Sequence, residues 1–181
     1  MKKNILLLGI TIVLITNSCA LSSFYKTKKT TSSFFVTFFV ENGINQYFIK
    51  PLNFKSKKEL LKIDFTFRDT CQNKTLIIAN YSIFSSQLIK NIDSAFFMVN
   101  NQKIYFKETE KLFIENKKQY QIRQTNKITY KELLQIFNND SQIHIFYSNN
   151  ELIFVPTSKT KKIKAKAQKI IFENIELNRK S

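Results

Sequence analysis

The sequence predicts an α+β fold that is mainly antiparallel β: a β-sandwich or a curved sheet, with a short helix and a C-terminal amphipathic helix. Three observations lead to this prediction. Apolar and polar residues alternate with period two over much of the chain, pairs of Asn separate apolar runs, and two segments show helical spacing instead. Period-two alternation is typical of half-buried strands, and Asn tolerates the positive φ of tight hairpin turns.

The first residues have the pattern of a secretory signal. Lys2 and Lys3 precede an apolar run over residues 5–15, and small or polar residues follow up to Cys19. As a helix this run is about 17 Å long, well short of the roughly 30 Å of a bilayer core. We therefore predict a cleaved signal peptide over residues 1–18.

The pair Ser18-Cys19 resembles the end of a lipobox, the motif of bacterial lipoproteins in which a Cys follows a small residue and becomes the acylated first residue. It is similar to the relaxed boxes of spirochaete-type lipoproteins, because Thr16 stands where an aliphatic residue is usual. The resemblance covers residues 1–19. It implies lipidation of Cys19 by acyl chains such as palmitate, which together hold a protein stably in a membrane. Ordinary signal-peptidase cleavage is the alternative.

Two segments follow the signal. Residues 19–33 are rich in Ser, Thr and Lys, so we predict a lipidated N-terminus and flexible tether there. No internal repeat and no second linker interrupts the remainder. We therefore predict a single β-rich domain over residues 34–177.

Strands are expected where apolar residues alternate or run together. Ile63, Phe65 and Phe67 face one way between polar neighbours, as in a half-buried strand. The other segments with a strand pattern are residues 34–40, 45–50, 75–84, 94–99, 103–107, 119–123 and 142–148. Tight turns are predicted at Asn100-Asn101 and Asn149-Asn150.

Two helices are expected among the strands. Thr129-x-x-Glu132 is a capping-box pattern, and the apolar residues that follow it share one helical face until Asn138-Asn139 ends the helix. A second helix is predicted after Ser158. Its apolar face is predicted to contain Ile163, Ala167, Ile170, Ile171 and Ile175.

The composition excludes several classes of protein. The 181 residues carry a net charge of +16 and are 43% hydrophobic, which is too apolar for a disordered chain. Two Gly, two Cys and one His leave no glycine-rich phosphate loop, disulfide framework or Cys/His metal cluster. Lys greatly outnumbers Arg, whereas a phosphate-binding surface favours the bidentate Arg side chain. We therefore expect no metal, no cofactor and no nucleic-acid partner.

No catalytic site can be assigned from the sequence. His144, the single His, lies on a predicted strand and is interpreted as an edge or surface residue rather than a catalytic base. Glu108/Glu110 and Glu173/Glu176 lie among lysines and are interpreted as solvated charges. Cys71 lies in a polar turn, and its alternatives are an unreactive thiol, an intermolecular disulfide or a redox-sensitive thiol near Arg68 and Lys74.

The stretch Lys159–Lys169 carries six lysines and no acidic residue. It is interpreted as the solvated face of the second helix, and contact with lipid headgroups or polyanions is the alternative.

We expect a non-enzymatic, membrane-anchored envelope lipoprotein, at the outer membrane or cell surface rather than the inner membrane. Its domain is expected to bind a protein or a polyanionic glycan. An envelope enzyme with an unrecognised site and a structural accessory subunit of a membrane complex are the alternatives. An enzyme should show converging polar groups in its largest pocket, whereas an accessory subunit should show an exposed apolar patch.

Overall fold

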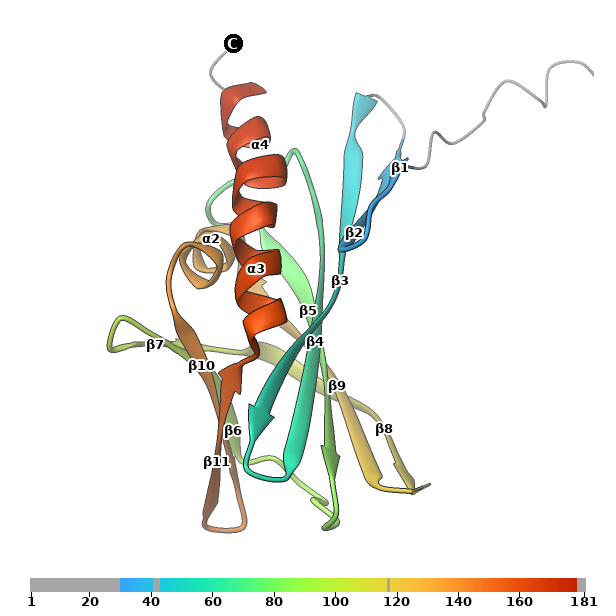
Figure 1. The fold of residues 1–181 in the computed structure, drawn as a ribbon, viewed down its shortest axis with the longest axis vertical. Coiled ribbons are helices and arrows are strands. Elements are labelled where there is room, and N and C mark those ends of the chain that lie inside the picture. The colour runs from blue at the N-terminus through green and yellow to red at the C-terminus, as the bar shows by residue number, and fades with distance from the viewer. Residues whose placement is uncertain (1–29, 41–42, 117, 179–181) are drawn as a thin grey trace, which may run out of the picture.

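The computed structural model describes residues 30–178 except 41–42 and 117, so the predicted signal peptide and Cys19 lie outside the described residues. The strands are β1 (Thr30–Thr31), β2 (Phe35–Phe39), β3 (Asn45–Ser56), β4 (Glu59–Arg68), β5 (Leu76–Ser85), β6 (Ser94–Val99), β7 (Gln102–Tyr105), β8 (Lys107–Asn116), β9 (Tyr120–Thr129), β10 (Ser141–Tyr147) and β11 (Asn150–Pro156). The helices are α2 (Tyr130–Asn138), α3 (Ser158–Ala167), the π-helical turn η3 (Gln168–Phe172) and α4 (Glu173–Asn178). The last three form one continuous helix (Figure 1).

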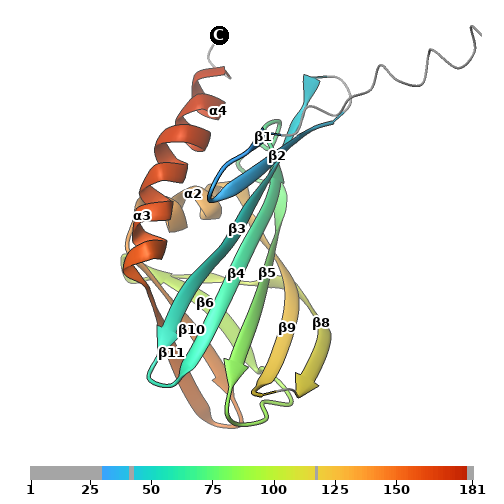
Figure 2. The ribbon, with the colours of Figure 1, turned by 45° about the vertical axis from the view of Figure 1, so that its right-hand side comes forward.

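These strands form one curled antiparallel sheet, so the predicted fold class is confirmed, with the curved sheet rather than the sandwich. The strand order is β7-β6-β10-β11-β3-β4-β5-β9-β8, with β2 added to β3 and β1 added to β2. Figure 2 shows the result as a half-barrel in which β3, β4 and β5 lie in front of β6 and β10. The short strand β1 comes from the end of the predicted tether.

One edge of β3 serves two partners. Its first half pairs with β2, and its last residues pair with β11, while β4 occupies the other edge. The change of partner falls near Lys50-Pro51, where the register between β3 and β4 shifts. Proline lacks the backbone N–H for a regular ladder and is tolerated at such an irregularity. The β11–β3 contact joins the two halves of the sheet.

Phe106 connects the two ends of the strand order. It is the single residue between β7 and β8, although these strands lie at opposite ends of the path through the sheet. Its ring stacks on Tyr81 of β5 at 5.3 Å and meets Phe97 of β6 edge-on at 5.5 Å. A residue from the sheet margin therefore packs between the two halves and helps to fill the interior of the half-barrel.

The hairpin turns confirm one prediction and correct another. Asn100 and Asn101 have φ values of 46° and 63°, as a two-residue hairpin turn requires. The second turn is one residue earlier than predicted. Ser148 and Asn149 have positive φ, whereas Asn150 already pairs with Tyr147.

Helix α2 begins at the predicted capping box. The Thr129 hydroxyl accepts a bond from the Glu132 N–H, and the Glu132 carboxylate accepts one from the Thr129 N–H at 2.6 Å. Burial raises the pKa of Glu132, but these bonds and the nearby Lys107 outweigh burial and lower its pKa overall. The capping box therefore favours the charged carboxylate.

The C-terminal helix docks through a face that differs from the predicted one. Ala167, Ile171 and Ile175 are buried as predicted, but Ile170 is 47% exposed. Two polar residues, Thr160 and Lys164, take central places on the buried face. The wider π-helical turn rotates the helix after Ala167, so that a sequence pattern read at 100° per residue fails there.

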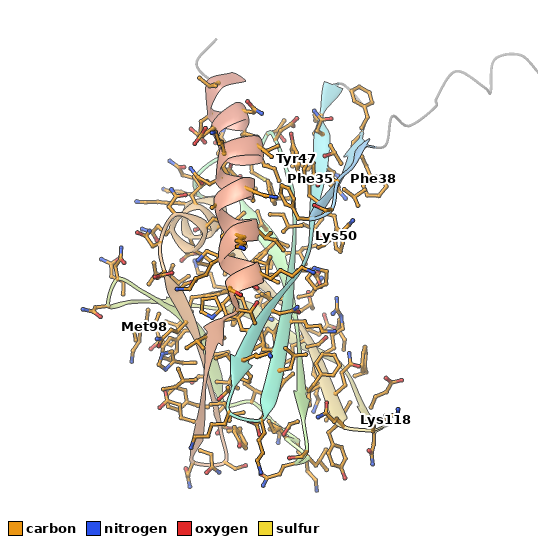
Figure 3. All side chains as sticks on the ribbon, in the orientation of Figure 1. Phe35, Phe38, Tyr47, Lys50, Met98 and Lys118 are labelled. Carbon is orange, nitrogen blue, oxygen red and sulfur yellow. The ribbon has the colours of Figure 1, made fainter. Side chains whose placement is uncertain are left out.

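The same turn brings Phe172 into the core. Its ring stacks on Phe67 of β4 at 5.5 Å and meets Phe137 of α2 at 5.1 Å. Phe67 stacks in turn on Tyr47 of β3, which packs near Phe35 of β2. Figure 3 shows Tyr47 and Phe35 close together at the end of the sheet near β2. This series of rings holds the helix against the sheet.

Candidate binding face

The outer side of β7, β6, β10 and β11 carries a row of mainly apolar side chains. Strand alternation turns the core residues inward and Phe96, Tyr105, His144 and Ile153 outward. The ladder then places these four side by side, because Phe96 pairs with both Tyr105 and His144, and His144 pairs with Ile153. The apolar residues at neighbouring outward positions are Met98, Phe146 and Val155, and the polar residues on the same side are Ser94, Lys103, Gln142 and Glu151. We call the first four residues, together with Met98, Phe146 and Val155, the aromatic face.

Phe96 is the centre of the aromatic face. Only 3% of it is exposed, although it points away from the core. The His144 ring stacks on it at 5.0 Å and almost parallel, Tyr105 packs at 5.2 Å, and the Lys103 amine lies 5.0 Å above the ring. Stacking and the cation–π contact both favour this arrangement, so the cluster is built before any partner arrives.

The imidazole of His144 is held on both sides. Its Nδ1 lies 2.6 Å from Glu151 Oε1, and its face is covered by Phe96. Its Nε2 is buried and has no hydrogen-bond partner among the described residues. His144 is therefore an outward residue of an inner strand, since β10 lies between β6 and β11, and the predicted edge position is corrected.

Around this centre, apolar side chains are open to solvent. Tyr105, Ile153 and Val155 are 50%, 41% and 46% exposed. Met98 shares the side of Phe96, because it lies two residues farther along β6, and Figure 3 shows it at the outside of the molecule. Exposed apolar residues that adjoin one another mark contact surfaces more often than isolated ones do. Tyr and Met are also enriched at interfaces between proteins.

A hollow of about 430 Å³ adjoins the aromatic face. It lies between the β6–β7 turn, the corner that joins α2 to β10, and the start of α3. Its lining combines an apolar part with an amide-rich and charged part, formed by Met98, Asn100, Asn101, Asp140, Ser141, Gln142, Val155, Pro156 and Lys161. Asn100 and Asn139 are joined by an amide hydrogen bond of 2.9 Å, which links the turn to the corner. His144 lines neither this hollow nor the next one.

A second hollow of about 520 Å³ shares Asp140 and Lys161 with the first and is lined also by Lys164. Lys164 is only 5% exposed, and its amine donates to the Asn139 carbonyl at 2.6 Å and to Ser141 Oγ at 3.0 Å. Burial lowers the pKa of Lys164 to about 8, with Lys161 adding to the effect and Asp140 opposing it. This amine attaches α3 to the corner before β10.

The outer side of β4, β5 and β9 is built differently. Arg123 makes an ion pair with Asp64 at 3.0 Å and donates to Ser82 Oγ at 3.0 Å. Asn80 donates to the other oxygen of Asp64 at 3.1 Å, and the Asp64 carboxylate is nearly inaccessible to solvent. We call Asp64, Asn80, Ser82 and Arg123 the polar cluster. Its charges and hydrogen bonds are satisfied within the sheet.

The remaining sequence-based candidates are scattered. Cys71 is 6% exposed and packs in the core rather than in an open turn. Its burial opposes both the intermolecular disulfide and the redox-sensitive thiol. Glu108 is paired with Lys127 at the margin of the sheet, and Glu173 is exposed at the start of α4, far from any catalytic arrangement.

Five of the six lysines at 159–169 are exposed, and Lys164 is the exception. Among the described residues no group of three or more His, Cys, Asp or Glu side chains could hold a metal ion. No helix in the described part of the chain has both the length and the apolar character needed to cross a membrane.

Comparison of the chain with protein-family models, with curated proteins and with solved structures finds no match.

Proposed function

We propose that the chain is a lipid-anchored envelope protein that binds a protein partner through its aromatic face and catalyses no reaction. The observation that carries this proposal is the preformed cluster around Phe96, bordered by Tyr105 and Ile153 in solvent. Burying these side chains against a partner contributes about 25 cal/mol for each Å² of apolar surface. The rigid stacking around Phe96 lowers the entropy cost of that burial.

The anchor in this proposal is Cys19. The support comes from the sequence, where an apolar run too short to span a bilayer ends at Ser18-Cys19. The described helices are compatible with it, because none of them is suited to crossing a membrane. Replacing Cys19 by Ala should abolish metabolic labelling with palmitate and release the protein from the membrane fraction. Retained labelling would contradict the anchor.

Binding is tested with two matched variants. Ile153 on the aromatic face and Ile78 on the outer side of β5 are 41% and 42% exposed, so they differ in position rather than in accessibility. The acylated protein is cross-linked in native membranes and the adducts are compared by mass spectrometry. Ile153→Asp should remove the adducts of the wild-type protein, and Ile78→Asp should keep them. Equal adducts from both variants would exclude the aromatic face.

The rival functions make different demands on the site. An enzyme needs converging polar groups, and the two hollows hold Asp140, Lys161 and Lys164 without the single His of the chain. A structural accessory subunit would use the same exposed apolar face as a binding protein. The binding protein and the accessory subunit differ in whether the partner dissociates. Recovery of the free protein after the solubilised complex has been diluted measures this difference.

A polyanionic glycan is the second candidate ligand, and one observation favours it. Exposed lysines follow α3 and η3 at positions 159, 161, 162, 166 and 169, and Lys161 also lines the first hollow. Lys161 is paired with Asp140 at 3.3 Å, which reduces the charge available there. The aromatic face remains the stronger basis, because exposed lysines on a helix are ordinary solvated side chains.

A further inference from the structure

We infer that the end of the domain formed by β1, β2 and the start of β3 contacts the membrane surface, with Phe38 and Phe39 in the headgroup region of an anionic bilayer. This inference rests on the proposed anchor at Cys19 and adds the orientation of the domain. The partner is a lipid surface that carries negatively charged headgroups.

The first described residues show where the chain enters the domain. Thr30 pairs with Thr37 and Thr31 pairs with Val36, so the entering segment runs beside the end of β2. Ser32 then accepts bonds from two backbone N–H groups at its Oγ, and its carbonyl accepts a bond from the Lys50 amine at 2.6 Å. The entry point is therefore fastened to the sheet at this end of the molecule.

The chain between Cys19 and the domain limits how far the domain can lie from the lipid. Ten residues separate Cys19 from Thr30. Even fully extended, a segment of this size reaches about 40 Å at most. The twelve residues of β3 alone cover about 40 Å at 3.3 Å each. An anchor at Cys19 thus limits the distance between the β2 end and the lipid to about 40 Å, while the opposite end can lie farther from the lipid by the length of β3.

Exposed aromatic side chains occur at this end of the domain. Phe39 is 46% exposed and Phe38 is 38% exposed, whereas Phe35 and Thr37 earlier in β2 are buried. The burial alternates along β2 only up to Thr37, after which both faces of the strand are open. Two neighbouring aromatic rings on opposite faces of a projecting strand are suited to insertion among headgroups, where aromatic side chains are favoured.

The sequence between the proposed anchor and the end of β2 carries a net positive charge. Residues 20–40 contain Lys26, Lys28 and Lys29 and no acidic residue. These three lysines outnumber the acidic residues close by, which are Glu41 in the sequence and Asp69, bonded to the start of β3. Lysines close to an anionic bilayer are attracted to it within a screening length. Charge and exposed aromatic rings therefore occur together in the part of the sequence that follows the anchor. The aromatic face lacks this combination, because no segment next to it in the sequence leads to the proposed anchor.

The absence of Trp from the chain allows a direct test. A single Trp is introduced at Phe39, at Phe38, or at Lys118 in the β8–β9 hairpin, which Figures 1 and 3 place at the opposite end of the molecule from β2. The full-length acylated variants are reconstituted into vesicles of phosphatidylcholine and phosphatidylglycerol with brominated acyl chains. Flotation of the vesicles reports the anchor, and quenching of Trp fluorescence reports contact with lipid.

We expect Phe39→Trp and Phe38→Trp to be quenched strongly, because such rings lie about 5–10 Å into the boundary between headgroups and acyl chains. Lys118→Trp should keep its fluorescence. Omitting phosphatidylglycerol or raising the salt concentration should weaken quenching at Phe39 while the vesicles still carry the protein. Protein that floats but shows equal quenching at positions 39 and 118 overturns the inference alone. Protein that fails to float overturns the anchor, and the inference with it.

Discussion

The aromatic face and the polar cluster occupy the outer sides of two parts of the same sheet, and they use similar components in opposite ways. Each part has a close contact to a carboxylate, from Arg123 in one and from His144 in the other, and each has a lysine amine about 5 Å above a phenylalanine ring. In the polar cluster the Asp64 carboxylate is buried and takes hydrogen bonds from Arg123 and Asn80. On the aromatic face the ring of Phe96 is buried, and the Lys103 amine and the Glu151 carboxylate lie around it.

This difference separates stability from binding. A buried carboxylate that is already paired attracts another molecule little, but removing its partner leaves an uncompensated charge. Exposed apolar side chains contribute little to the fold, and they gain free energy when a partner covers them. One outer region of the sheet therefore satisfies its own polar groups, whereas the other surrounds a buried ring with exposed apolar side chains that are available for contact. Five predictions test this division.

The largest effect is expected at the centre of the aromatic face. Replacing Phe96 by Ala should lower the free energy of unfolding by about 3–4 kcal/mol, since the ring is almost fully buried among three other rings. The matched variant Phe84→Ala removes the half-buried ring below Lys62 and should cost clearly less. Urea unfolding measures both. Equal losses would show that the aromatic face is no better packed than the polar side.

The next effect is expected in the polar cluster. Arg123→Met leaves the Asp64 carboxylate buried with a bond from Asn80 but without its ion pair, and should cost about 2–3 kcal/mol. The cost is below the maximum for a buried pair because Arg123 is 28% exposed. Adding Asp64→Asn to Arg123→Met should recover part of the loss by removing the charge. No recovery in the double variant would mean that Arg123 acts through packing instead.

Lys164 is the second buried charge among the described residues, in addition to Asp64, and it lies at the corner that joins α2 to β10. The folded chain releases its proton near pH 8, whereas the unfolded chain holds it up to about 10.5, so unfolding takes up a proton between these values. The free energy of unfolding should therefore rise between pH 8 and 10, by at most about 2 kcal/mol. Lys164→Met should lack this rise. The window ends near pH 10 because burial also raises the pKa of Tyr81, which opposes stability at higher pH.

A small effect on stability is expected from the exposed isoleucines. Ile153→Ser and Ile78→Ser should each change the free energy of unfolding by less than about 0.5 kcal/mol, as is usual for exposed positions. Thermal unfolding of the two variants measures this. A large loss at Ile153 alone would indicate that the exposed side chains around Phe96, and not Phe96 alone, stabilise the fold, and they would then no longer be free to serve binding only.

The smallest effect is expected from the exposed lysines of α3. Retention on immobilised heparin should disappear near physiological salt, where charges are screened beyond about 8 Å. Changing Lys159, Lys162 and Lys166 together to Ser should remove the retention seen at low salt without changing the melting temperature. Firm retention of the wild type well above physiological salt would point to a formed polyanion site and would favour the glycan over the protein partner.

Local patterns predicted most of the elements. The alternation around Phe65, the Asn100-Asn101 turn and the capping box at Thr129 each depend on neighbours within a few residues, and the structure confirms all three. The face of the C-terminal helix was predicted less well. Ile170 is exposed because a π-helical turn changes the angle between successive residues, and no residue of the segment signals such a turn.

The candidate site could not be predicted from the sequence, for a different reason. Phe96 and His144 are 48 positions apart in the chain and become neighbours only through the register between β6 and β10. Lys164 was assigned to a run of solvated lysines, and its burial depends on the Asn139 carbonyl and the Ser141 hydroxyl of another element. Thr160 is buried because its hydroxyl and the backbone of Asn53, 107 positions away, exchange two hydrogen bonds.

The two joints of the curled sheet have a consequence for how the chain folds. The halves meet where β11 pairs with β3, and they also share the continuous segment on either side of Phe106. Closing a loop of some hundred residues is entropically slow, so we expect the last strand to limit the folding rate. Until β11 has been made, β3 lacks a neighbour along part of its edge. A chain that has to wait for β11 completes its sheet only after residues 150–156 have been synthesised.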